Sequence, residues 1–77
     1  MNSILSEKKK LSVIGAGAWG TALANLLAKK NHQVNLWVYE KDLCRIIEEK
    51  RENVRYLPGT KLSGNITPFF DLEEAVS

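Results

Sequence analysis

Hydrophobic residues along this chain fall into short runs whose spacing changes from one segment to the next. Leu11–Ile14 is a β-prone apolar run that ends abruptly at a glycine, which is typical of a buried parallel strand, and we expect it to begin near Lys9. From Trp19 to Lys30 apolar residues recur every three or four positions, so this segment predicts a helix that ends near Asn31. The stripe expected to cover a sheet comprises Trp19, Ala22, Leu23, Leu26 and Leu27.

The second half of the chain continues the alternation. Val34–Tyr39 has β-branched and aromatic residues with apolar side chains on one face, which predicts a second strand. After Glu40 the apolar positions return to helical spacing and indicate a half-exposed helix of about three turns. Residues 53–64 carry turn-forming dipeptides and predict a long connection. Asn65–Phe70 predicts a third strand, which Pro68 favours at an edge of the sheet. The order β-α-β-α-β predicts a parallel sheet.

The end of the sequence predicts an element that has only begun. Asp71 followed three residues later by Glu74 resembles the capping box at the start of a helix. The sequence stops at Ser77, within the first turns of that third helix. In the expected strand order 3-2-1, the first strand would also keep an unpaired outer edge. We therefore expect residues 1–77 to be the amino-terminal part of a longer protein.

Composition excludes several classes of function. The 77 residues are 44% hydrophobic and 26% charged, which is typical of a folded protein rather than a disordered one. A formal net charge of +2 gives no support to nucleic-acid binding. Cys44 is the single cysteine and has no nearby cysteine or histidine in the sequence, so neither an intrachain disulfide nor a metal site is expected. Without an apolar run of membrane-spanning length or a signal peptide, the sequence predicts a cytoplasmic protein.

Glycines mark the junction between the first strand and the first helix. The segment Gly15-Ala16-Gly17-Ala18-Trp19-Gly20 matches the pattern G-x-G-x-x-G of dinucleotide-binding folds. In that pattern the first glycine permits a tight turn, the second lets a pyrophosphate approach the backbone, and the third lets the helix pack closely on the sheet. The helix amino terminus would then bind the phosphates without a lysine. The alternative is that these glycines only turn a strand-to-helix corner. Trp19 could cover a cofactor or substrate, or pack within the apolar stripe.

Glu40 has the position of the acidic residue that completes this pattern. It lies at the expected end of the second strand, about 20 residues after the last glycine, where a carboxylate accepts hydrogen bonds from ribose hydroxyls. Its charge would repel a 2′-phosphate and therefore favours NAD over NADP. Lys41 could instead reach a 2′-phosphate. The alternative for Glu40 is a cap of the second helix or a solvated side chain. Together these features predict a Rossmann-type βαβαβ half with three parallel strands, within an α/β fold.

Three blocks of sequence resemble the bacterial NAD(P)-dependent glycerol-3-phosphate dehydrogenases: residues 13–24 around the glycine pattern, 32–37, and 53–59 with its Tyr-Leu-Pro-Gly motif. The resemblance implies that NAD or NADP contacts the glycine loop, the end of the second strand and the third block. Serine is common in the family where Ala18 stands, and arginine is common where Tyr39 stands, which leaves the choice of cofactor open. The cofactor-binding residues implied are Gly15, Ala16, Gly17, Ala18, Trp19, Gly20, Tyr39, Glu40 and Tyr56.

The resemblance also implies an activity, the interconversion of dihydroxyacetone phosphate and sn-glycerol 3-phosphate by hydride transfer for phospholipid synthesis. The family's substrate-binding and catalytic residues would lie beyond Ser77, so no catalytic residue is expected in this chain. A homodimer of the full-length enzyme is compatible with the resemblance. Two alternatives remain at this stage. One is another two-domain dehydrogenase, related to ketopantoate reductase or to sugar-nucleotide dehydrogenases, and the other is a nucleotide-binding module without chemistry.

Overall fold

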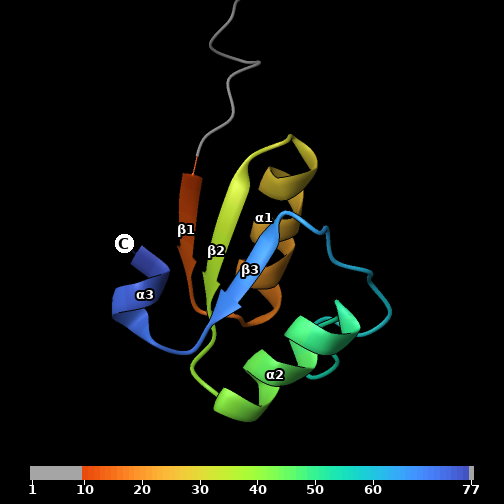
Figure 1. Ribbon diagram of the computed structural model, residues 1–77. Coiled ribbons are helices and arrows are strands. Elements are labelled where there is room, and N and C mark those ends of the chain that lie inside the picture. Colours follow the sequence, from red (N-terminus) through yellow and green to blue (C-terminus); the bar gives the residue numbers. More distant parts are fainter. Residues whose placement is uncertain (1–9, 77) are drawn as a thin grey trace, which may run out of the picture.

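The computed structural model describes residues 10–76, in which strands and helices alternate along the chain (Figure 1). Each predicted element is present, with ends that differ from the predicted ones by one or two residues, and the start expected near Lys9 lies outside the described residues. The elements are β1 (Lys10–Ile14), α1 (Ala18–Lys29), β2 (Gln33–Trp37), α2 (Lys41–Lys50), β3 (Ile66–Phe69) and α3 (Leu72–Val76).

The three strands form one parallel sheet in the order β1-β2-β3. This is the predicted order 3-2-1 counted from the other edge. Leu36 in the central strand pairs with Val13 on one side and Pro68 on the other. Since β3 lies at an edge, the missing N–H group of Pro68 leaves no gap within the sheet, as the sequence suggested. Within residues 10–76, β1 pairs with β2 alone.

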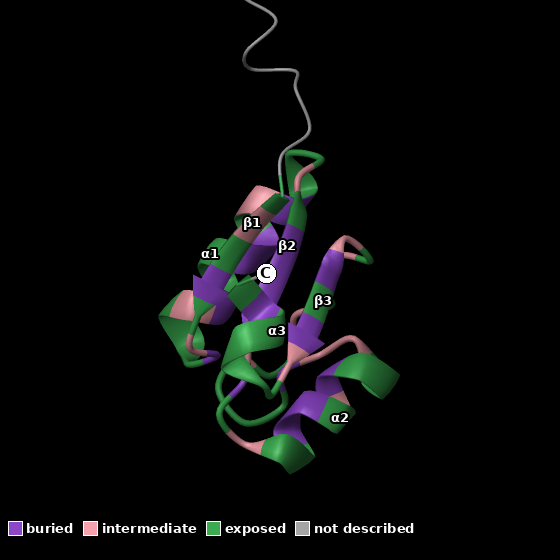
Figure 2. Ribbon diagram, turned by 60° about the vertical axis from the view of Figure 1, so that its left-hand side comes forward, coloured by how far each residue is buried: buried purple, intermediate pink, exposed green. Residues whose placement is uncertain are grey.

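The core lies between the sheet and the two long helices. Apolar side chains from β1, β2 and β3 meet those of α1 and α2 on one face of the sheet, and Leu62 from the long connection joins them. Figure 2 shows the buried residues along β2, the central strand. The opposite face carries α3, where Ser12 Oγ and Asn35 Nδ2 donate to the carbonyl oxygen of Ala75 at 2.7 and 3.2 Å.

Helix α1 turns a different face to the sheet from the one predicted. Leu23 and Leu26 are about half exposed and Trp19 is 89% exposed, so among the large side chains of the expected stripe only Leu27 packs against the core. The physical reason is the close approach at Gly20, where a Cβ atom would lie 1.9 Å from the Gly15 carbonyl oxygen. At this separation small side chains fit against the strands better than leucines. The buried residues of α1 are Thr21, Ala24, Asn25 and Ala28.

The helix ends show how individual residues stop each element. Asn31, just beyond α1, has a φ of 74°, and its N–H donates to the Ala28 carbonyl oxygen at 3.0 Å. Arg51, just beyond α2, has a φ of 56°. At the start of α3, Asp71 Oδ1 accepts from the Glu73 N–H at 2.9 Å, which confirms the predicted capping role of Asp71.

Candidate dinucleotide-binding site

The glycine loop leaves β1 in a backbone conformation that favours glycine. Gly15 has a φ of 102°, which is in the left-handed region that side-chain-bearing residues rarely adopt. Its N–H donates to the Trp37 carbonyl oxygen at 3.1 Å. This hydrogen bond holds the beginning of the loop against the end of β2, so the loop and the residues that follow β2 lie at the same edge of the sheet.

Gly17 and Gly20, the other two glycines of the pattern, differ in whether the fold itself requires a glycine there. Gly20 is required by the fold, because a Cβ atom there would collide with the Gly15 backbone. Gly17 has φ −70° and ψ −175°, which any residue can adopt, and within residues 10–76 a Cβ atom there would meet no atom within 4 Å beyond the two adjoining residues. The corner-turning alternative therefore accounts for Gly15 and Gly20 but gives no reason for glycine at position 17.

The amino terminus of α1 has no side-chain cap. Gly17 is the N-cap residue and supplies no side chain, and the first turn contains no acidic residue. The first hydrogen bond of the helix runs from the Thr21 N–H to the Gly17 carbonyl oxygen at 2.9 Å. The backbone N–H groups of the three residues before Thr21 therefore have no acceptor within the helix. In the described part of the chain, the positive end of the helix dipole thus has neither a side-chain cap nor an acidic residue in its first turn, a condition that suits an anion.

A buried asparagine ties this loop to the Tyr56 segment. Asn53 is fully buried, and its Nδ2 donates to the Ala16 carbonyl oxygen and to Thr21 Oγ1, both at 2.8 Å. Its Oδ1 accepts from the Tyr56 N–H at 3.0 Å. One side chain therefore fixes the glycine loop, the first turn of α1 and the turn that bears Tyr56 relative to one another.

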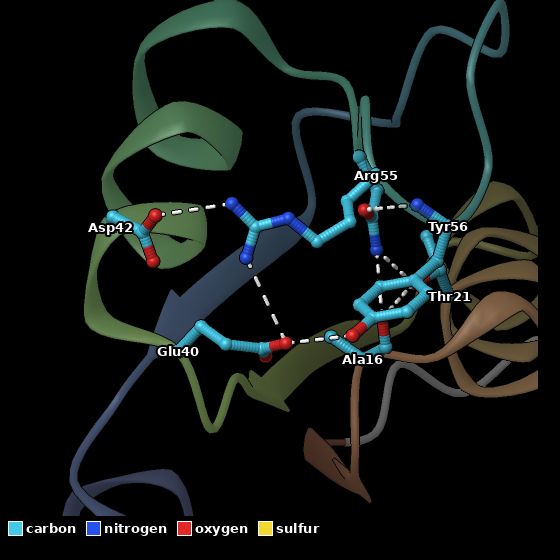
Figure 3. A network of polar contacts seen from close by, with 7 residues as sticks. Ala16, Thr21, Glu40, Asp42, Arg55 and Tyr56 are labelled. Carbon is cyan, nitrogen blue, oxygen red and sulfur yellow. Dashed lines mark hydrogen bonds and ion pairs between the residues drawn. The ribbon is translucent and has the colours of Figure 1, made fainter.

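Glu40 lies in a network of polar contacts after β2 (Figure 3). Tyr56 Oη donates to Glu40 Oε2 at 2.7 Å, and Arg55 Nη1 lies 3.8 Å from the same oxygen. Arg55 Nη2 also donates to Asp42 Oδ2 at 3.0 Å. Glu40 occupies the N-cap position of α2, but its side chain makes no capping hydrogen bond. The capping alternative for its carboxylate is therefore wrong.

These contacts shift the acidities of the groups involved. The hydrogen bond to the Glu40 carboxylate raises the pKa of Tyr56, because losing the phenolic proton would place two anions together. The hydrogen bond from Arg55 lowers the pKa of Asp42, and the same bond raises the pKa of Arg55. The network thus favours an ionised Asp42 paired with the Arg55 guanidinium, and a Tyr56 that keeps its phenolic proton.

Three residues that the sequence analysis singled out lie apart from this network. Tyr39 is 78% exposed, and its ring meets the Trp37 ring edge-on with the centroids 6.0 Å apart. Lys41 directs its ammonium over the Phe70 ring, 5.0 Å from the centroid, and not toward Glu40. Trp19 is next to the loop but almost fully exposed, so the alternative that it packs in the core is wrong.

A hollow of about 320 Å³ lies elsewhere, between α2, β3 and the start of α3. Lys41, Arg45 and Phe70 line it, and the glycine loop does not. Residues 10–76 contain no group of three His, Cys, Asp or Glu side chains arranged to hold a metal ion. None of the helices in the described part of the chain combines the length and apolar character needed to cross a bilayer.

Comparison with known proteins decides the family. Residues 10–77 match the family model described as the amino terminus of NAD-dependent glycerol-3-phosphate dehydrogenase. The chain belongs to this family. The chain is 50% identical over 66 residues to the glycerol-3-phosphate dehydrogenase [NAD(P)+] of Syntrophobacter fumaroxidans, covering 86% of the chain and 19% of that protein. It is 52% identical over 67 residues to the enzyme of the same name from Citrifermentans bemidjiense, and the match covers 87% of this chain and 20% of that protein.

Solved structures of this dehydrogenase family have the same fold. Glycerol-3-phosphate dehydrogenase from Coxiella burnetii superposes with a TM-score of 0.83 at 38% identity, covering 90% of this chain and 21% of that one. The enzyme from Saccharomyces cerevisiae superposes with a TM-score of 0.81 at 34% identity, covering 92% of this chain and 24% of the yeast one. The chain therefore spans about a fifth of the length of the relatives that it matches.

Sequence reasoning missed two residues of this family member's candidate site. Asn53 and Arg55 both fall in the block that carries the resemblance, yet neither received a role. Most of their contacts are long-range, such as Arg55 with Asp42, 13 residues apart, and Asn53 with Ala16, 37 residues apart. The polar residues beside Tyr56 in this block were the available signal, but a linear pattern does not say which loop each side chain reaches.

Proposed function

We propose that this chain is the NAD(P)-binding portion of a glycerol-3-phosphate dehydrogenase. In this proposal the full protein interconverts dihydroxyacetone phosphate and sn-glycerol 3-phosphate for glycerophospholipid synthesis. The family membership and the names of the relatives support the activity. The observation that carries the cofactor assignment is Gly17, which is a glycine that the fold itself does not need, placed at the uncapped start of α1.

The residues present fit a dinucleotide in two places. The backbone N–H groups that begin α1 would bind the pyrophosphate, because Gly17 leaves them uncovered and the helix dipole favours an anion there. Glu40 would accept hydrogen bonds from the adenosine ribose hydroxyls, with Tyr56 holding its carboxylate. The proposed cofactor-binding residues are Gly15, Ala16, Gly17, Ala18, Trp19, Gly20, Tyr39, Glu40 and Tyr56.

The chemistry itself would come from the cofactor and from other parts of the protein. When bound, the nicotinamide would supply or accept the hydride. We propose that residues 1–77 are the amino-terminal part of the Rossmann domain, with the catalytic groups elsewhere in the full protein, because the chain spans about a fifth of its relatives. A cytoplasmic location and a homodimeric enzyme complete the proposal. The single free cysteine, Cys44, supports the location, since it fits a reducing compartment.

Replacing Gly17 with alanine tests this assignment in the full-length protein. The Gly17→Ala variant should leave the melting temperature nearly unchanged, since alanine fits this backbone and its gain of about 0.4–1 kcal/mol from the unfolded state offsets its poorer fit to an N-cap position. Its affinity for NADH should nevertheless fall by about ten-fold or more, because the methyl group would stand where the pyrophosphate must approach. Titration of NADH followed by fluorescence, together with thermal melting, measures both quantities.

Gly20→Ala is the matched control, because the added methyl group would collide with the Gly15 carbonyl. It should lower the melting temperature as well as the affinity. The unchanged protein should also oxidise NADH or NADPH when dihydroxyacetone phosphate is added. Full NADH affinity in Gly17→Ala would contradict the assignment of the loop, and indifference to dihydroxyacetone phosphate would contradict the assigned reaction.

A further inference from the structure

Arg55 stands between two carboxylates at the sugar end of the candidate site. Its Nη2 donates to Asp42 at 3.0 Å, while its Nη1 lies 3.8 Å from Glu40 Oε2 (Figure 3). The contact with Asp42 is within hydrogen-bond distance, whereas the one with Glu40 is a looser ion pair. Arg55 therefore offers a positive charge beside the carboxylate that we propose receives the ribose hydroxyls.

The ion pair between Arg55 and Asp42 is exposed enough for Arg55 to take another anion in place of Asp42. The Arg55 side chain is 40% exposed and that of Asp42 is 70% exposed, and ion pairs this exposed contribute little to stability. A guanidinium is a planar fork that binds phosphate through two parallel hydrogen bonds. Replacing a carboxylate partner with a phosphate dianion would thus cost the fold little.

From these contacts we propose that Arg55 is the residue that decides how the site treats the adenosine 2′ position. Paired with Asp42, it leaves Glu40 to accept the 2′-hydroxyl of NAD. Turned away from Asp42, it binds the 2′-phosphate of NADP and offsets the repulsion from Glu40. This inference rests on the proposed function, because it assumes that the ribose lies against Glu40.

The geometry favours Arg55 over the basic residue that the sequence suggested. Lys41 follows Glu40 directly, but its ammonium lies over the Phe70 ring. Arg55 lies 15 positions after Glu40 in the sequence, and the turn that Asn53 anchors brings it close to Glu40. A 2′-phosphate takes the place of the hydroxyl at the same ribose carbon, so a phosphate accepted beside Glu40 would be near the Arg55 guanidinium.

The test compares affinities for NAD+ and NADP+ in the full-length protein by calorimetric titration. Arg55→Ala should weaken NADP+ binding by about ten-fold or more, the loss of a charge-assisted contact, and change NAD+ binding by less than about two-fold. NADP+ binding to the unchanged protein should also weaken more steeply with added salt than NAD+ binding, and Arg55→Ala should remove most of that difference. Arg45→Ala, which removes an equal charge from the exposed surface of α2, should change neither affinity.

Asp42→Asn provides a second, opposite test that does not remove Arg55. By freeing the guanidinium it should raise the affinity for NADP+ relative to NAD+. An equal loss of both affinities in Arg55→Ala with an unchanged melting temperature, or an unchanged NADP+ affinity, would overturn the inference. If the unchanged protein bound neither dinucleotide, the proposed function would fail and this inference with it. If it bound NAD+ but Arg55→Ala did not discriminate between the two, only the inference would fail.

Discussion

Asn53 makes three hydrogen bonds from a fully buried position, and two of its partners belong to the glycine loop and the first turn of α1. Asn53→Ala would leave the Ala16 carbonyl oxygen and the Tyr56 N–H without this partner. We expect a loss of about 2 kcal/mol in the free energy of unfolding. Affinity for NADH should fall as well, because the loop and the Tyr56 turn would no longer be fixed together.

Urea unfolding and NADH titration measure these two effects of Asn53→Ala. The control is Gln33→Ala, which removes an exposed amide that donates to Asn65 Oδ1 at 3.3 Å. Gln33→Ala should change the free energy of unfolding by less than about 0.5 kcal/mol. If the two variants lost the same stability, the anchoring role of Asn53 would be rejected.

At the residue scale, the sequence predicted what a local pattern requires. Gly15 and Gly20 have the conformation and the close contact that the glycine pattern implies. Glu40 follows β2 as expected, and the resemblance singled out Tyr56, whose hydroxyl donates to it. Arg55 could not be foreseen, because its two carboxylate partners come from another element and only the folded chain brings them together.

Two helices end at residues with the same left-handed backbone but with different side-chain contacts. Asn31 and Arg51 have φ values of 74° and 56°. Arg51 Nη2 also donates to the carbonyl oxygens of Ser63 and Ile66, both at 2.6 Å. Asn31→Gly should therefore leave the free energy of unfolding within about 0.5 kcal/mol, since glycine suits this position. Arg51→Gly should lower it by about 1–3 kcal/mol despite the relieved backbone, because two charge-assisted bonds are lost.

Equilibrium urea unfolding distinguishes these two helix-end variants. Asn31→Ala serves as the reference for backbone strain and should cost about 1 kcal/mol, since alanine tolerates this conformation poorly. Equal tolerance of glycine at positions 31 and 51 would show that the Arg51 contacts add nothing to the backbone effect.

At the element scale, helical spacing predicted that α1 exists but not which face it buries. The leucines of the expected stripe, Leu23 and Leu26, are about half exposed, and the small residues Ala24 and Ala28 face the sheet instead. Periodicity treats large apolar residues as the best evidence of a buried face. Here the packing distance set by Gly20 decides the orientation, and a pattern of hydrophobicity contains no information about that distance.

At the scale of the whole molecule, the two faces of the sheet are held by different kinds of contact. On the face of α1 and α2, Val34 and Leu36 are buried among apolar side chains. On the other face, α3 is a helix of five residues whose Ala75 carbonyl oxygen accepts from Asn35 and Ser12. We infer that α3 depends on these polar contacts, whereas α1 and α2 depend on the apolar core.

Asn35→Val separates the contributions of the two faces. Ala75 would keep its bond from Ser12, so the free energy of unfolding should fall by no more than about 1 kcal/mol. Amide hydrogen exchange should accelerate in α3 and stay unchanged in α1 and α2, because local opening of one weakly held element does not require the core to unfold. Leu36→Ala, at the next position of the same strand, should cost about 2–5 kcal/mol and accelerate exchange in every element. Faster exchange in α1 on Asn35→Val would mean that α3 and the core open together.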